Sequence, residues 1–368
     1  MLRASLLLSL LVLLSALSSP APAQAIYHRA FIDEVMSGVG GDPDAQYVEI
    51  WMETDGQNLV DDTRLTIFNA DGSAFTVLLL LQGNVPNGDR GGRWIMATEA
   101  FAALPEVQQA GFTPDFIFPP GILTPTGMLC WGAPEAPLPS ENWNPKFPFF
   151  YTDCVAYGDY TGGDALHQPP SDLPPGDGTM SLQRVELPTD DGGDLNDWAL
   201  RCPSPQNNAG QLLLLGPDDD ADGLPNCHEA ELGTDPNVVD TDQDGCADGE
   251  EAGLAATLGG QRDPTRFWDF LDVPAGTPRQ RDQRVNIIDI AAIVLRFGTV
   301  STPPTKPDAL AEALTPPPDT TSYHTAYDRG GPIPGEDLWD LLPPDGAINI
   351  IDIGAAIIQF GHTCSASP

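Results

Sequence analysis

Basic side chains are scarce in this chain of 368 residues. Lys and Arg together number 16 against 53 Asp and Glu, so the formal net charge is −37. A surface this negative repels nucleic acid and anionic lipid, and we expect neither as a partner. An excess of carboxylates on this scale favours cations as ligands instead.

Long apolar runs are also absent after Ala25, because no later run approaches the roughly 20 residues that a membrane-spanning helix needs. The N-terminal stretch, MLRASLLLSLLVLLSALSSPAPAQA, combines Arg3 with a leucine-rich run and ends on Ala23-Gln24-Ala25. This arrangement is typical of a secretory signal peptide that is cleaved before Ile26. We therefore expect a secreted or cell-surface protein without membrane insertion after cleavage. An uncleaved N-terminal anchor is the alternative.

Motifs of the common enzyme classes are missing. The sequence contains no H-E-x-x-H, no G-x-S-x-G and no glycine-rich phosphate loop. Its five histidines are scattered: His28, His167, His228, His324 and His362. We expect no enzymatic activity. The abundant acids leave a hydrolase with a carboxylate pair as the alternative, because counting does not exclude it.

Six cysteines in an exported chain are expected to form disulfides, for which fifteen complete pairings exist. Short separations along the chain favour Cys130 with Cys154 and Cys227 with Cys246. Long helices are disfavoured, because 38 Pro and 37 Gly make up about a fifth of the chain.

Residues 26–210 contain short apolar runs separated by Gly, Pro, Asn and Asp. QYVEIWME largely alternates in polarity, and LTIFN, FTVLLLL, RWIMA, MLCW, DCVAY, SLQRV and WALR follow it. Runs of this length without a helical period predict a mainly β fold, a two-sheet antiparallel sandwich. The longer connections, such as GAPEAPLPSENWNPKFP, are expected to be proline-rich loops.

The order of these pieces resembles the bacterial lamin-tail-like domain. The matching stretches are an opening FIDEVMSGVGGDPDAQYVEIWME and a closing GTMSLQRVELPTDDGGDLNDWALRCPSPQNNAG. The resemblance covers nearly all of the segment that we place at 26–210, and it implies an immunoglobulin-like sandwich. Asp33 stands where the family often has Asn, and the centre is longer than usual. A β-sandwich of another kind is the alternative.

Two later stretches match the calcium-loop pattern D-x-[DN]-x-[DN]-G-x5-E without a mismatch. In DDDADGLPNCHE, the ligands expected at loop positions 1, 3, 5, 7, 9 and 12 are Asp218, Asp220, Asp222, Leu224, Asn226 and Glu229. In DTDQDGCADGEE, they are Asp240, Asp242, Asp244, Cys246, Asp248 and Glu251. Position 7 serves through its backbone carbonyl, and glycine at position 6 permits the turn.

This spacing suits calcium, which takes 6 to 8 hard oxygen ligands at about 2.3–2.6 Å. Alternate residues of a tight loop point inward, and the final Glu supplies two oxygens. Zinc is disfavoured because paired His or thiolate ligands are lacking. The alternative is a solvated acidic linker, since 13 acids and no Lys or Arg lie between Asp218 and Glu251.

The stretch ELGTDPN, followed by DTDQDG and with a cysteine inside each loop, resembles the thrombospondin type 3 repeat. The match covers 218–251, within a segment that we place at 211–255. It implies calcium-wrapped, nearly helix-free loops that pack on one another, often with disulfides.

Near its end the chain repeats itself. NIIDIAAIVLRFG, which begins at Asn286, and NIIDIGAAIIQFG, which begins at Asn349, are identical at 8 of 13 positions. They predict two short, largely buried helices, each ended by a glycine, with these apolar residues inside: Ile290, Ile293, Val294 and Phe297, then Ile353, Ile357, Ile358 and Phe360. Because neither helix can bury its apolar face alone, we expect each copy to be the other's core partner.

Each copy follows the end of a further loop, whose positions 5, 9 and 12 offer calcium ligands: Asp282, Asn286 and Asp289, then Asp345, Asn349 and Asp352. A duplicated loop–helix unit with Asp at position 12 resembles a dockerin domain, here at 256–368, and implies two calcium loops with packed helices. Asp272 stands ten residues before Asp282 where the family has four, and Gln283 replaces the glycine. Asp340 lies five residues before Asp345, and a Pro-rich insert at 299–338 separates the copies. A helical hairpin without metal is the alternative.

These features together predict a non-catalytic, calcium-binding secreted or cell-surface protein with a structural, adhesion or binding role. Its partners besides calcium would be a cell-surface protein, a cohesin-like domain or a polysaccharide. The alternative is a dockerin-bearing subunit that a cohesin docks into a polysaccharide-processing assembly. The loop insertions and the lack of a catalytic domain favour the first.

Overall fold

The computed structural model describes residues 27–121, 123–132, 151–162, 178–185, 197–276, 278–302 and 309–364. The chain divides into two compact units, Met1–Leu215 and Gly216–Pro368. The expected signal peptide and nearly all of the loop GAPEAPLPSENWNPKFP lie outside the described residues. Within the described ranges, no helix has the length and apolar character needed to cross a bilayer.

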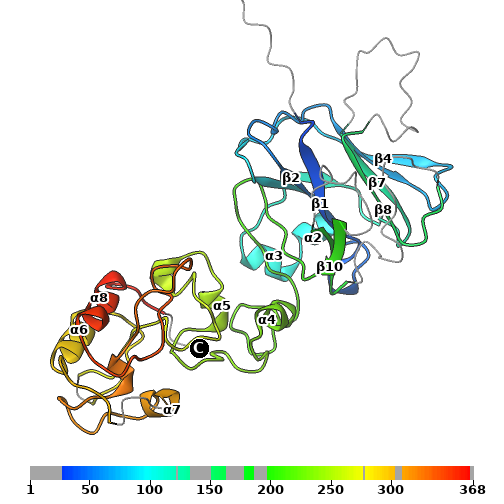
Figure 1. Cartoon of the computed structure of the whole chain (residues 1–368). Helices are drawn as coiled ribbons and strands as arrows, with labels where there is room; N and C mark the ends of the chain where they lie inside the picture. Colours follow the sequence, from blue (N-terminus) through cyan, green and yellow to red (C-terminus); the bar gives the residue numbers. More distant parts are fainter. Residues whose placement is uncertain are drawn as a thin grey trace, which may run out of the picture. The chain divides into compact units, whose positions relative to one another are not determined.

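The first unit is mainly β, as the sequence predicts (Figure 1). Its described strands are β1 (Ala30–Met36), β2 (Tyr47–Met52), β3 (Arg64–Phe68), β4 (Phe75–Leu80), β5 (Arg93–Thr98), β6 (Phe116–Phe118), β7 (Gly127–Gly132), β8 (Asp153–Tyr157), β9 (Ser181–Arg184) and β10 (Trp198–Arg201). One sheet has the order β10-β9-β1-β2-β5-β6 and the other β4-β3-β7-β8. Their facing side chains share one apolar core.

The expectation of a purely antiparallel arrangement is wrong at one edge, where β5 and β6 run parallel. Parallel neighbours need a crossover connection, usually helical. Two short helices that the sequence did not predict provide it: α2 (Glu99–Ala102) and α3 (Pro105–Gln109). The Thr98 side chain caps α2 by accepting the N–H of Phe101, and Pro105 opens α3. A short 3-10 turn, Val39–Gly41, follows β1.

Aromatic packing and a disulfide hold the first unit together. Trp94 on β5 and Trp131 on β7 meet edge to face across the core, with ring centroids 5.5 Å apart. Cys130 and Cys154 are direct neighbours on β7 and β8 and form the disulfide that their separation predicts.

The second unit consists of loops and short helices. The helices are α4 (Asn226–Leu232), α5 (Asp248–Glu251), α6 (Ile287–Val294), α7 (Ala309–Ala313) and α8 (Ile350–Ile358), with 3-10 turns at Ala256–Leu258 and Thr325–Tyr327. The repeated sequences form α6 and α8, which lie side by side (Figure 1). The prediction that the two copies pack together is therefore confirmed.

Hydrogen bonds around these helices follow the internal repeat. The N–H of Gly298 donates to the Ile348 carbonyl, and the N–H of Gly361 donates to the Val285 carbonyl, both at 2.8 Å. The two donors occupy equivalent positions in the two copies, and so do the two acceptors. Each copy thus binds the other through the same backbone contact, which gives the pair an approximate twofold symmetry.

The expected core of the helix pair is wrong in part. Ile293 is buried, and so are Ala292, Ala355 and Ala356. Several larger apolar side chains expected inside are 41–57 % exposed: Val294, Phe297, Ile357, Ile358 and Phe360. A short helix buries one stripe at the 3.6-residue period, and here alanines fill that stripe, so the larger neighbours fall outside it.

The Pro-rich insert packs against the helix pair and is not merely a linker between the two copies. Ala313, Ala326 and Tyr327 belong to the same apolar cluster as Ile293. The guanidinium of Arg296 lies 3.7 Å above the ring of Tyr327. Residues 256–368 therefore have a core to which the insert belongs.

The second expected disulfide is wrong, because Cys246 pairs with Cys364 and not with Cys227. The chain end returns to the calcium-pattern loops, where Cys246, Phe270 and Cys364 belong to one buried cluster. Proximity along the chain did not reveal this contact over a sequence separation of 118. Cys227 is disulfide-bonded as well, and all six cysteines lie in the described ranges with none free.

Candidate metal centres

The two calcium-pattern loops fold alike. In each, the carboxylate at position 1 accepts the N–H groups of positions 4 and 6, at 2.6–3.0 Å: Asp218 from Ala221 and Gly223, and Asp240 from Gln243 and Gly245. Positions 4 and 6 have φ values of 63° and 96° in the first loop and 68° and 109° in the second. This left-handed backbone explains the glycine at position 6.

The first loop gathers three of its expected ligands. Asp218, Asp220 and Asp222 each place an oxygen within 4.8 Å of the others. Glu229 on α4 is fully buried, and neither of its Oε atoms has a hydrogen-bond partner among the described residues. Burial, followed by repulsion from Asp220 and Asp222, raises the pKa of Glu229 to about 7.

The second loop gathers a more deeply buried set. Asp242, Asp244 and Glu251 place oxygens within 4.8 Å of one another and of Asp269, which no loop motif includes. Asp242 is 8 % exposed, and the other three are essentially inaccessible. Burial, followed by repulsion from Asp244, raises the pKa of Asp242 to about 10. Burial is also the main cause that raises the pKa of Asp244, to about 7, and the pKa of Glu251.

Most other expected ligands of these loops, Glu229 among them, lie outside the gathered sets; the sulfur of Cys246 lies within 4.8 Å of Asp244 and Glu251 but is held in a disulfide. Asn226 and Asp248, at position 9, each accept the N–H of position 2 at 2.9 Å and so brace the loop backbone. Asp240 is not within the second set. Leu224 and Cys246 are buried, and their N–H groups donate to the position-5 carboxylates at 2.8 Å.

The loop before α6 also brings three acids together. Oxygens of Asp272, Asp282 and Asp289 lie within 4.8 Å of one another. A β-bridge across residues 275–280 folds the intervening residues out as a hairpin, so the ten-residue spacing is no obstacle. Asp272 accepts the N–H of Gln283 at 2.6 Å, as position 1 does from position 6 in the other loops.

Gln283 replaces the glycine without losing its conformation, since its φ is 61°. Burial and repulsion from Asp289 raise the pKa of Asp272 to about 8, and burial raises the pKa of Asp289 to about 6. Asn286 does not join the set. Its side chain caps α6 by accepting the N–H of Ile288 at 2.7 Å.

The loop before α8 does not gather its acids within the part of the chain that the structure describes. The position-1 role belongs to Asp328, which accepts the N–H of Gly346 at 2.8 Å. A second hairpin, within residues 329–342, separates Asp328 from Asp345. Asn349 caps α8, and Asp352 accepts the Asn349 N–H at 2.6 Å.

The sequence patterns therefore did not give the roles of three acids, Asp269, Asp272 and Asp328. Asp272 and Asp328 stand too far upstream for a loop pattern, and only the folding of the hairpins makes them position-1 residues. Asp269 lies well beyond Glu251, where the second loop ends. The feature of the sequence that could have identified Asp269 is its place between Trp268 and Phe270, because a carboxylate buried among aromatic residues needs a partner.

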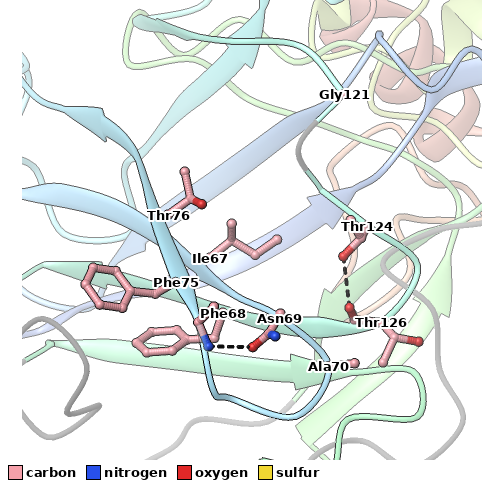
Figure 2. A pocket seen from close by; sticks show the side chains of 10 residues that line it. Ile67, Phe68, Asn69, Ala70, Phe75, Thr76, Gly121, Thr124 and Thr126 are labelled. Carbon is pink, nitrogen blue, oxygen red and sulfur yellow. Dashed lines mark hydrogen bonds between the residues drawn. The ribbon is translucent and has the colours of Figure 1, made fainter.

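The first unit carries a pocket of about 470 Å³ over β3 and β4 (Figure 2). Phe68 and Phe75 lie on one side of it, and Asn69 closes the adjoining turn by accepting the Ala74 N–H. None of the described residues that line it is titratable: Ile67, Phe68, Asn69, Ala70, Ala74, Phe75, Thr76, Gly121, Thr124 and Thr126. The pocket offers aromatic and hydroxyl groups, but among these residues no acid–base pair.

Residues of the second unit fit a hard cation. Buried carboxylate oxygens of Glu251 converge with those of Asp242, Asp244 and Asp269, and both Glu251 and Glu229 lack donors among the described residues. Carboxylates without paired imidazole or thiolate suit calcium and not zinc, and the cysteines are disulfide-bonded. Comparison with protein-family models, with curated proteins and with solved structures finds no match.

Proposed function

We propose that this chain is a non-catalytic, calcium-binding protein, secreted or held at the cell surface, with a structural, adhesion or binding role. The observation that supports this most directly is the cluster of Asp242, Asp244, Glu251 and Asp269, in which every carboxylate is buried and has an oxygen without a hydrogen-bond partner among the described residues. The first loop has matching geometry and gathers three half-buried aspartates. A buried carboxylate without a donor is strongly unfavourable. A divalent cation removes this penalty and offsets the repulsion between the acids.

The families that we propose for the separate segments are those that their sequences resemble. The first unit is an immunoglobulin-like, lamin-tail-like sandwich, which the two sheets around one core support. Residues 211–255 are thrombospondin type 3-like loops, and 256–368 form a dockerin-like pair, for which the approximate twofold symmetry is the support. The disulfides suit an oxidising, extracellular compartment, consistent with export through a signal peptide at 1–25.

One observation favours a second function, that of a subunit docked by a cohesin-like domain. The helix pair exposes several large apolar side chains, including Ile287 at 65 % and Ile350 at 69 %. Exposed apolar patches of this kind are typical of protein contacts. In the first function, the partner is instead a cell-surface protein or a polysaccharide bound by the first unit.

Calorimetric titration of the mature chain with calcium tests the proposal. Asp222→Ala and Asp244→Ala should each remove one binding site, because each carboxylate belongs to a different cluster. Asp219→Ala is the matched control, since Asp219 is an exposed acid of the first loop that lies outside the gathered set. Equal effects of all three substitutions would indicate diffuse counter-ion attraction and contradict specific coordination.

A further inference from the structure

Asp269 comes from outside the calcium-pattern loops, yet it belongs to the cluster of the second one. Its position is fixed from two sides. Its Oδ2 accepts the N–H of Asp263 at 2.9 Å, and its carbonyl accepts Gln359 Nε2 at 2.7 Å. The remaining oxygen, Oδ1, is buried in the cluster and has no hydrogen-bond partner among the described residues.

Glu251 meets Asp269 from α5. Its side chain is fully buried, and both of its Oε atoms lack hydrogen-bond partners within the described part of the chain. One oxygen each of Asp242 and Asp244 is in the same condition. None of the ion pairs formed by the described residues includes any of these four carboxylates. Arg262 and Arg281 lower the pKa of Asp244 electrostatically, but neither forms an ion pair with any of the four acids. The oxygens without partners therefore converge at a point that a cation would stabilise.

We propose that Asp269 is a ligand of the cation held by the second loop, so that the metal ties residues 261–273 to residues 240–251. This inference rests on the proposed calcium function. The two loops then differ in the origin of their ligands, because the gathered aspartates of the first all come from that loop.

The residues beside Asp269 show what the metal would stabilise. Phe270 is buried in one cluster with Cys246 and Cys364. The N–H of Leu271 donates to the Gln359 side chain at 2.9 Å, and Leu271 is part of the core around α6 and α8. A cation at this junction therefore orders the start of the helical core as well as the loop.

Hydrogen exchange of the mature chain, with calcium and with chelator, tests the inference through Asp269→Asn. The amide keeps the shape and an acceptor for the Asp263 N–H, but it removes one charge. In chelator the variant should exchange more slowly than the wild type over 267–273, because repulsion from Asp242, Asp244 and Glu251 is relieved. In calcium the order should reverse, and the affinity of one site should fall about tenfold or more.

Asp340→Asn is the matched control. Asp340 is also a buried acid of this unit, 9 % exposed, and its charge raises the pKa of Asp269, but it lies outside the cluster. Its substitution should leave the number of calcium sites and the calcium protection of 267–273 unchanged. A loss equal to that of Asp269→Asn would point to a general charge effect and overturn the inference.

The remaining outcomes separate the inference from the function on which it rests. Wild-type affinity in Asp269→Asn, with calcium protection confined to 218–251, overturns the ligand role and leaves the calcium function standing. A wild-type chain that takes up no calcium overturns both. If Asp269→Asn does not fold, Glu251→Gln gives the answer: loss of calcium protection at 267–273 supports the inference, and retained protection overturns it.

Discussion

Buried acids in the two units differ in whether hydrogen bonds satisfy them. Glu34 on β1 accepts the Tyr47 hydroxyl and the Ser204 N–H, whereas Glu251 has no donor among the described residues. Burial nevertheless raises the pKa of Glu34 to about 7, against these hydrogen bonds and with repulsion from Asp33. An acid that has its own donors is structural, and one without them is a candidate for a cation.

We expect Glu34 to make the stability of the first unit depend on pH. A carboxyl whose folded pKa is about 7, against an ordinary value of 4.5, binds its proton more tightly in the folded state. Its contribution is therefore complete below pH 4.5 and is lost as the pH rises through 7. Between these values, denaturant titration should show a fall in unfolding free energy on the order of 3 kcal/mol.

Glu34→Gln should flatten that pH profile, because the amide keeps an acceptor for the Tyr47 hydroxyl and no longer titrates. The pH dependence of stability will not vanish, because burial also raises the pKa of Glu49, which the variant retains. Glu106→Gln, at an exposed position on α3, is the control and should leave the profile as it is. A wild-type profile that is flat over this range would contradict the prediction.

At the scale of elements, the repeated Asn-x-x-Asp has a role that needs no metal. In α6, Asn286 caps the helix and Asp289 accepts the Asn286 N–H in return, and α8 has the same capping box. Position 9 of a calcium loop is thus also the N-cap of a helix, and position 12 is the third residue of that helix. For this reason the motif predicts the two helices well, but it is weaker evidence for a metal site.

Ile293→Asp should destabilise the second unit by about 3 kcal/mol or more, because it buries an unpaired charge in the core between α6 and α8. Val294→Asp on the same helix is the control, since Val294 is 48 % exposed and a charge there stays in water. It should cost about 1 kcal/mol at most. Urea titration of both variants measures the difference. Equal losses would mean that the helix pair buries a different face.

The sequence predicted those elements whose cause is local. Short runs such as RWIMA and DCVAY became β5 and β8, and the loop spacing brought Asp218, Asp220 and Asp222 together. The parallel pairing of β6 was not predictable, because it depends on a crossover by helices too short to show a period. Asp269 and the disulfide of Cys246 with Cys364 depend on contacts between distant segments, which no spacing reveals.

At the scale of the molecule, the acidic clusters found among the loop and repeat residues belong to the second unit. The gathered sets around Asp222, Asp244 and Asp272 all lie within Gly216–Pro368. The first unit has its own apolar core and a disulfide between β7 and β8. We therefore expect a cation bound at these sets to stabilise the second unit.

Calorimetry of the mature chain should accordingly resolve two transitions that respond differently to chelator. At ten times its dissociation constant, calcium contributes about 1.4 kcal/mol per site, so removing it from two sites costs about 3 kcal/mol. For a unit of this size, that loss lowers the melting temperature by roughly 6–12 °C. The transition of the first unit should stay in place, because its core includes none of the gathered acids. Magnesium should restore little, since it demands near-octahedral geometry and keeps its waters. If chelator shifts neither transition, the calcium proposal is wrong.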